Sequence, residues 1–227
     1  MEHGQPCQRI RGPARTASAD LRRGAGKLLD AADTTVEQIR SRGRKGSLQA
    51  LRNAVLLKTV YAFGLPRSEV VGLDLTDLRV NPKAADYGRC GGVFVRWAKS
   101  SRGGPPKRRT VLTVPEMDWI VGILGHYVDE VRPHSGADPH PAFWLTERCG
   151  RITNRSVNEA FAETRSAAGL PPELDLHSLR HSYITHLKVR GIASDASFDR
   201  NGDRDPVRDL GFRGLPAAGW MLGRHAA

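Results

Sequence analysis

The amino-acid sequence predicts an α+β domain that is mainly α. Apolar residues recur at helical spacing from Leu48 to Phe63 and again from Asp175 to Val189. Short runs of β-prone residues lie between these two segments, bounded by Asn, Gly and Pro. They are Leu75–Val80, Val93–Ala98 and Thr110–Val114. We therefore expect helices packed around a small antiparallel sheet of three strands.

Helix start and stop signals define the remaining helices. Gly64 ends the helix that begins near Leu48, and Pro66 suits the first turn of a second, short helix. Pro115 opens a helix that runs to Val131, with its aromatic residues on the core side. Thr153 is a plausible cap for a further helix that extends to Ala168 and is closed by Gly169.

The last two β-prone runs are joined by the loop SSRGGPPK, which predicts a β-hairpin with a basic tip. Lys99 falls at the end of the first strand, and Lys107, Arg108 and Arg109 stand opposite. A basic hairpin tip can reach into a groove of DNA, but it can equally be a solvated turn. The spacing alone leaves both interpretations open.

Charge favours a polyanionic partner. The chain of 227 residues holds 35 Lys and Arg against 24 Asp and Glu, which gives a formal charge of +11 and a pI near 10.2. Nucleic acid is the simplest partner, and a solvated basic surface is the alternative. The basic residues cluster at Arg9–Arg23, Arg40–Lys45 and Lys99–Arg109.

Three cysteines lie far apart, with no metal-like spacing to histidine, so the sequence indicates neither a disulfide framework nor a zinc site. The longest apolar run, Val55 to Leu65, is interrupted by Lys58 and is shorter than the ~20 residues of a membrane span. The N-terminus lacks a signal-type apolar core. We expect a cytoplasmic protein without metal, cofactor or membrane partner.

His177 and Arg180 carry the clearest chemical signal. Residues three apart share one face of a helix, so the two side chains would point at one object. A guanidinium matches phosphate oxygens two at a time, and a histidine exchanges a proton near neutral pH. The pair suits a phosphodiester, although such a pair also occurs by chance on solvated helices.

Three segments, in order, resemble the boxes of the tyrosine recombinases, the phage integrase family. YAFGLPRSEVVGLDLTDL resembles the first box, in which Gly-Leu-Arg-x-x-Glu supplies the first catalytic arginine. VRWAKSSRGGPPKRRTVLTVP resembles the hairpin with the catalytic lysine. LDLHSLRHSYITHL is similar to the second box, His-x-x-Arg. The resemblance implies a partial catalytic domain over residues 47–190, with 1–46 a basic arm left from a DNA-gripping domain.

The family's chemistry assigns a role to each residue type. A tyrosine attacks a DNA phosphodiester without metal or nucleotide cofactor, while arginines and histidine stabilise the charge on the phosphate. The resemblance makes Arg180 a phosphate clamp, His177 an acid/base or hydrogen-bonding partner, and Lys99 the general acid. It implies double-stranded DNA as partner and a homo-oligomer on DNA. The residues expected to contact DNA are Arg102, Lys107, Arg108, Arg109 and His181.

The sequence departs from the family pattern in two places. Pro66 stands where the family has its first arginine, and Arg67, one residue along a helix, should point about 100° away. No nucleophile is found, because Tyr61, Tyr87, Tyr127 and Tyr183 all precede the interval where the family's tyrosine falls. Tyr183 shares a helix with Arg180 and is expected to face the core.

These departures favour a DNA-binding member of the family that is catalytically defective. The alternatives are an active recombinase or nickase with an unrecognised nucleophile, and a non-enzymatic protein that interferes with intact integrases. Residues 191–227 are rich in Arg, Asp, Gly and Ala, with no sustained period. We expect a disordered tail there, translated out of the ancestral reading frame.

Overall fold

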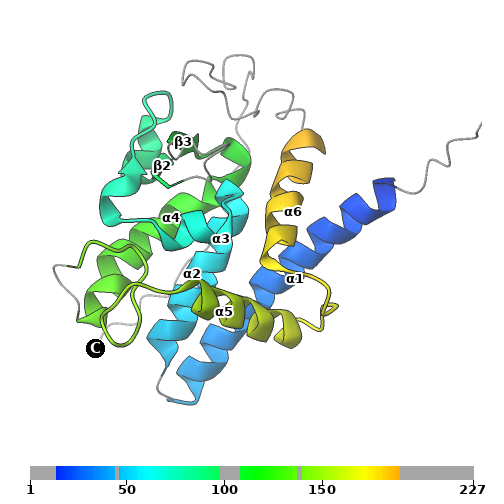
Figure 1. The fold of residues 1–227 in the computed structure, drawn as a ribbon, viewed down its shortest axis with the longest axis horizontal. Helices are drawn as coiled ribbons and strands as arrows, with labels where there is room; N and C mark the ends of the chain where they lie inside the picture. Colours follow the sequence, from blue (N-terminus) through cyan, green and yellow to red (C-terminus); the bar gives the residue numbers. More distant parts are fainter. Residues whose placement is uncertain (1–13, 44–45, 98–107, 137–139, 190–227) are drawn as a thin grey trace, which may run out of the picture.

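A computed structural model describes residues 14–43, 46–97, 108–136 and 140–189 of the chain, with side chains from Arg23 to Leu187 within these ranges (Figure 1). The α-helices are α1 Ala14–Ser41, α2 Ser47–Phe63, α3 Arg67–Val71, α4 Trp119–His126, α5 Asn154–Ala167 and α6 Leu176–Val189. The strands are β1 Leu78–Arg79, β2 Gly92–Val95 and β3 Arg109–Leu112. The expected α+β architecture, mainly α, is confirmed.

Helix α2 is the centre of the core. Leu56, Leu57, Val60 and Phe63 have no measurable exposure, and α2 packs against α1, α4, α5 and α6. A helix that is apolar on most sides must be covered on most sides. Gly64 caps the C-terminal end of the helix. It adopts a left-handed φ of 57°, and its N–H donates a hydrogen bond to the carbonyl oxygen of Val60.

Helix α1 differs from the sequence prediction, which placed residues 1–46 outside the core. These residues were expected to form a basic arm, yet a helix spans Ala14–Ser41. Ala25, Leu28, Ala32 and Val36 are buried where α1 packs against α2, α5 and α6. Alanines make half of this buried stripe, and they let helices approach closely while adding little to the apolar signal of the sequence.

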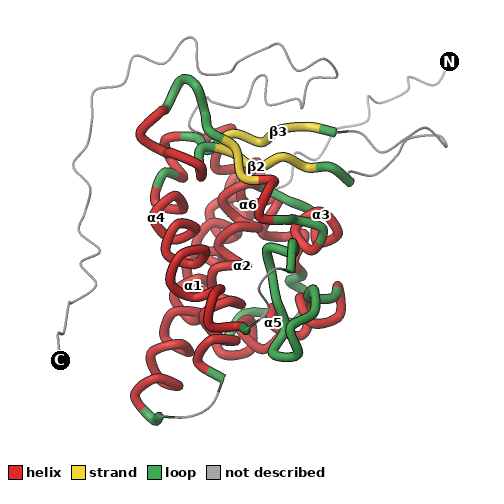
Figure 2. Tube along the Cα trace, turned by 90° about the vertical axis from the view of Figure 1, so that its left-hand side faces the viewer, coloured by secondary structure: helices red, strands yellow, loops and turns green. Residues whose placement is uncertain are grey.

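The sheet lies across one end of the helical body (Figure 2). Its order is β1-β2-β3 and both pairings are antiparallel, with Leu78 opposite Val93 and Val95 opposite Arg109. The predicted hairpin is therefore confirmed. The first predicted strand is shorter than expected, because Leu75–Asp77 forms a 3-10 turn in which the Asp77 carboxylate accepts from the Asp74 N–H at 2.8 Å.

The segment after β3 was predicted to be one continuous helix. It is instead a short helix, α4, with a turn of a different kind on each side. A 3-10 turn at Pro115–Met117 precedes α4, and a π-helical turn follows it at Tyr127–Val131. Tyr127 lies 5.0 Å from Trp144 between ring centroids, and Trp144 lies 4.6 Å from Phe143. All three are almost fully buried, so these aromatic residues are core residues, as expected.

Side-chain caps fix the starts of α5 and α6. The Thr153 hydroxyl accepts from the Ser156 N–H at 3.2 Å, which confirms the predicted cap of α5. The Asp175 carboxylate accepts from the Ser178 N–H at 3.0 Å, one residue before α6 begins. This cap fixes where α6 begins, and therefore the direction in which the side chains of its first turn, including His177, point.

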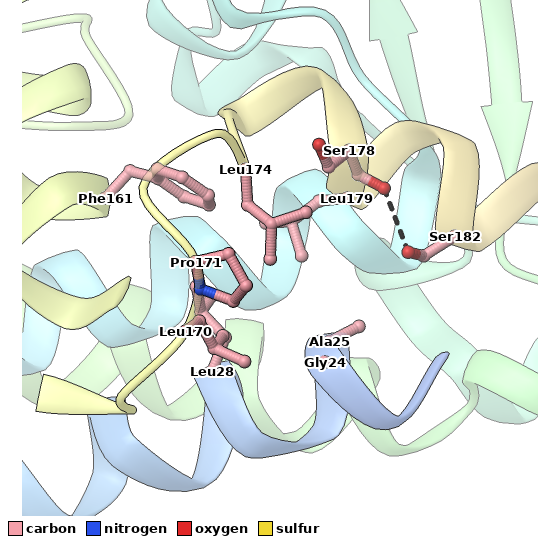
Figure 3. A pocket seen from close by; sticks show the side chains of 10 residues that line it. All are labelled: Gly24, Ala25, Leu28, Phe161, Leu170, Pro171, Leu174, Ser178, Leu179 and Ser182. Atoms are coloured by element: carbon pink, nitrogen blue, oxygen red, sulfur yellow. Dashed lines mark hydrogen bonds between the residues drawn. The ribbon is translucent and has the colours of Figure 1, made fainter. Parts of the chain in front are cut away.

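An apolar hollow of about 250 Å³ separates α1 from the loop between α5 and α6 (Figure 3). It is lined by Gly24, Ala25, Leu28, Phe161, Leu170, Pro171, Leu174, Ser178, Leu179 and Ser182. Its mostly apolar lining offers few groups that could bind a charged ligand. In the described part of the chain, no helix is long and apolar enough to cross a membrane, and no cluster of three or more potential metal ligands occurs.

Candidate functional site

His177 and Arg180 both line one polar cleft of about 580 Å³, between α3, α5 and the start of α6. Their i, i+3 spacing on α6 brings the two side chains to the same face, as the sequence predicted. Three arginines and one carboxylate contribute to the cleft wall. The lining residues are Leu65, Pro66, Arg67, Ser68, Asn158, Phe161, Ala162, Arg165, Asp175, Leu176, His177 and Arg180. The cleft therefore favours an anionic ligand.

Arg180 is held in place by the end of α2. Its Nη1 donates a hydrogen bond to the carbonyl oxygen of Gly64. Burial lowers the pKa of Arg180 from its ordinary value, and the nearby charge of Arg109 lowers it further. A guanidinium whose charge is already poorly solvated gains more from a phosphate than one that is fully hydrated.

Arg67 also lines the cleft, although helical geometry predicted that it would point away. The reason is that α3 begins at Arg67, whereas Pro66 is the extended residue before the helix, with φ −61° and ψ 152°. Residues 66 and 67 are thus not consecutive positions on one helix, and the expected rotation of about 100° does not apply. Arg67 Nη1 donates to Asn158 Oδ1 at 2.8 Å.

His177 and His181 form an exposed pair on α6. Their ring centroids are 4.4 Å apart in an edge-to-face arrangement, and His177 lines the cleft whereas His181 does not. The exposure of both rings leaves them accessible to a large ligand. The predicted contact of His181 with DNA stays a prediction.

The basic residues of the hairpin do not share one environment. Arg108 is exposed beside the start of β3. Arg109 donates from Nη1 and Nη2 to the two carboxylate oxygens of buried Glu69. Both terminal nitrogens are engaged by a carboxylate, so this geometry disfavours the predicted contact of Arg109 with DNA. Lys99, Arg102 and Lys107 lie outside the described residues.

None of the chain's four tyrosines is among the residues that line the cleft. Tyr183 faces the core, as predicted, with 5% exposure, and burial raises its pKa to about 12. Tyr127 is 1% exposed and its pKa is likewise raised by burial to about 12. The Tyr61 hydroxyl is engaged with Nδ1 of His186 at 3.0 Å. Burial keeps the hydroxyls of Tyr183 and Tyr127 protonated and away from a substrate.

Two cleft residues, Asn158 and Arg165, were missed from the sequence. Both lie on α5, seven residues apart and therefore on one face of the helix. Arg165 Nη1 donates to the carbonyl oxygens of Pro172 and Leu174 at 2.6 Å and 2.7 Å, which ties down the loop before α6. Their spacing in the sequence predicts that they share one face of a helix. No feature of the sequence, however, indicated that this face of α5 packs beside His177.

Solved structures confirm the fold of this domain as that of the tyrosine recombinase catalytic domains. The chain aligns with XerA recombinase at a TM-score of 0.52 and 18% identity, covering 83% of this chain and 53% of XerA. It aligns with XerH site-specific recombinase bound to a difH substrate at a TM-score of 0.53 and 18% identity, covering 74% and 42%.

Sequence comparison defines the family. The model of the phage integrase family matches residues 27–196. Tyrosine recombinase XerC of Nitrobacter winogradskyi is 32% identical over 62% of this chain and 38% of its own length. Tyrosine recombinase XerD of Mycobacterium leprae is 29% identical over 69% of this chain and 46% of its own length. The chain belongs to the phage integrase family of tyrosine recombinases, and it spans less than half the length of these curated relatives.

Proposed function

We propose that this chain binds duplex DNA through backbone phosphates at the cleft and does not cleave it. One observation carries the proposal: Arg67, His177 and Arg180 line the same cleft, in a family whose members act on DNA as recombinases. The three side chains come from two elements distant in sequence, so their convergence is a property of the fold. Guanidinium groups and a histidine on one concave surface are suited to a phosphodiester.

Strand cleavage in this family uses a tyrosine, and among the described residues no tyrosine lines the cleft. The four tyrosines lie elsewhere, and the pKa of Tyr183 is raised by burial to about 12. The roles proposed for the remaining residues are those the family pattern gives: Arg180 and Arg67 bind phosphate oxygens, and His177 donates to them. Lys99, outside the described residues, keeps the general-acid role of that pattern. Residues 47–190 correspond to the proposed catalytic region, with α1 packed onto it.

The test is binding of the full chain to fluorescently labelled duplex DNA, measured by anisotropy from 25 mM to 200 mM salt. Phosphate-dominated binding should be weak, with a dissociation constant on the order of 10⁻⁴ to 10⁻⁶ M at physiological salt, and should fall steeply with salt. Arg180→Gln should weaken binding and reduce the salt slope by about 0.9. Arg155→Gln is the matched control, because Arg155 is an exposed arginine outside the cleft.

Cleavage is tested separately with a nicked suicide DNA substrate that traps a covalent phosphotyrosyl adduct. We expect no adduct on denaturing gels. An adduct would overturn the non-catalytic part of the proposal. Absence of binding at low salt, or equal binding by wild type and Arg180→Gln, would overturn the DNA-binding part.

A further inference from the structure

Arg67 lines the cleft directly after Pro66, the residue at which the family pattern has an arginine. Pro66 and Arg67 both line the cleft, because the extended backbone at Pro66 brings the first helical residue of α3 to the same wall. Arg67 is exposed, so its guanidinium is reachable by a macromolecular ligand. A long, exposed side chain of this kind loses much rotamer freedom when it is fixed on a ligand. Some contact that restrains it beforehand would strengthen binding.

Asn158 supplies such a contact. Its Oδ1 accepts from Arg67 Nη1 at 2.8 Å, and Asn158 itself lines the cleft from α5. An arginine has five N–H donors in a rigid fork, so one hydrogen bond leaves others for a phosphate. The acceptor is a neutral amide, and it orients the guanidinium without cancelling its charge.

Arg109 shows the opposite arrangement in the same molecule. Its two terminal nitrogens donate to the Glu69 carboxylate, and the side chain of Glu69 is 5% exposed. A carboxylate both orients and neutralises its arginine. Arg67, which lines the cleft together with His177, instead donates to an uncharged oxygen, that of the Asn158 amide.

We infer that Asn158 is a positioning residue that presents Arg67 to DNA phosphate as the replacement for the arginine absent at Pro66. The inference rests on the proposed function. If Asn158 positions Arg67, DNA affinity should depend on the chemical nature of the side chain at residue 158 as well as on its size. If Arg67 is only an exposed surface arginine, it should not.

The experiment compares Asn158→Ala, Asn158→Asp and Arg67→Gln in the anisotropy titration of the full chain with duplex DNA. Asn158→Ala removes the restraint and should weaken binding about three- to tenfold, the range of one lost hydrogen bond. Asn158→Asp keeps the acceptor but neutralises Arg67, so it should weaken binding more than Asn158→Ala. Arg67→Gln should reduce the salt slope by about 0.9.

The matched control is Asn154→Asp, the same chemical change one turn earlier on α5, at an exposed position outside the cleft. It corrects for the change in net charge, and it should bind better than Asn158→Asp. In the Arg67→Gln background, Asn158→Ala should have little further effect, because the two residues act through one contact.

Two results would overturn the inference while leaving DNA binding intact. One is a normal affinity of Asn158→Asp relative to Asn154→Asp in a protein that still requires Arg180. The other is an effect of Asn158→Ala that persists at full size in the Arg67→Gln background. If Arg180→Gln also binds like wild type, the proposed function itself fails, and the inference fails with it.

Discussion

The Glu69 carboxylate accepts hydrogen bonds from both terminal nitrogens of Arg109, at 2.9 Å and 2.5 Å. Glu69 belongs to α3 and Arg109 opens β3, so this pair fastens the hairpin to the helix that borders the cleft. Glu69→Gln should destabilise the fold by about 3–5 kcal/mol, because it replaces the carboxylate that accepts from both terminal nitrogens of this half-buried guanidinium with a neutral amide. Urea unfolding followed by circular dichroism measures the change.

A double variant tests whether the stability lost in Glu69→Gln comes from the half-buried charge of Arg109. Glu69→Leu with Arg109→Met replaces both partners by apolar groups, and it should recover most of the stability that Glu69→Gln loses. Equal stability of wild type and Glu69→Gln would show that the pair contributes nothing to the fold.

Gly64 is a position where only glycine fits. Its φ is +57°, and a Cβ built on it would lie 2.3 Å from Cδ1 of Tyr183. Gly64→Ala should therefore destabilise the protein by about 1–3 kcal/mol from overpacking, with a further cost of about 1 kcal/mol from the left-handed backbone. Because Gly64 also accepts from Arg180, the variant should weaken DNA binding too. Thermal unfolding and the anisotropy titration provide the two measurements.

Gly26→Ala is the contrasting glycine substitution. Gly26 lies within α1, where a Cβ would meet nothing within 4 Å. Alanine should stabilise the helix by about 0.5–1 kcal/mol and leave DNA binding unchanged. If Gly64→Ala proved as stable as Gly26→Ala, the contact between Tyr183 and Gly64 would be wrong.

Asp74 makes the fold sensitive to acid. Burial raises its pKa, but hydrogen bonds from Arg151 and Arg96 outweigh burial, so the pKa lies below its ordinary value of 3.8. A carboxyl with a lowered pKa stabilises the folded state above about pH 4, and this contribution is lost as the pH falls through the folded-state pKa. Asp74→Asn should cost about 1.5–3 kcal/mol at pH 7, and the difference from wild type should shrink below pH 4.

Urea unfolding at pH 7, 5, 4 and 3 follows this difference. Asp86→Asn is the control, because Asp86 is exposed. A difference between wild type and Asp74→Asn that stayed constant with pH would exclude an ionised Asp74 as its source.

The sequence predicted those parts of the fold that local signals determine. The hairpin, α5 with its Thr153 cap, and the core-facing side of α6 were all predicted, because alternation, capping residues and a period of 3.6 are written in consecutive residues. The packing of α1 was not, since its buried face contains Ala25 and Ala32, and alanine is common on both faces of a helix.

The cleft was predicted only in part, for a similar reason. His177 and Arg180 are three residues apart, so their convergence follows from helical geometry. The partner of Arg109, Glu69, is 40 residues away in the sequence, and the partner of Arg67, Asn158, is 91 residues away. No local sequence pattern predicts contacts at such separations. The direction of the Arg67 side chain depends on the residue at which α3 begins. A shift of one residue in that helix boundary would change whether the side chain lines the cleft.

Pro66→Arg tests how far the cleft can be restored. Pro66 already lines the cleft, precedes α3 and has an extended backbone that arginine adopts without strain, so a new guanidinium should face the same ligand as Arg67 and Arg180. DNA affinity at low salt should rise, and the salt slope should steepen by about 0.9, the value of one added phosphate contact. The suicide substrate should still yield no adduct, because the substitution adds a phosphate ligand and no nucleophile. Ser68→Arg, on the same wall, is the control for added charge, and a larger gain from Ser68→Arg than from Pro66→Arg would mean that position 66 has no special relation to the phosphate.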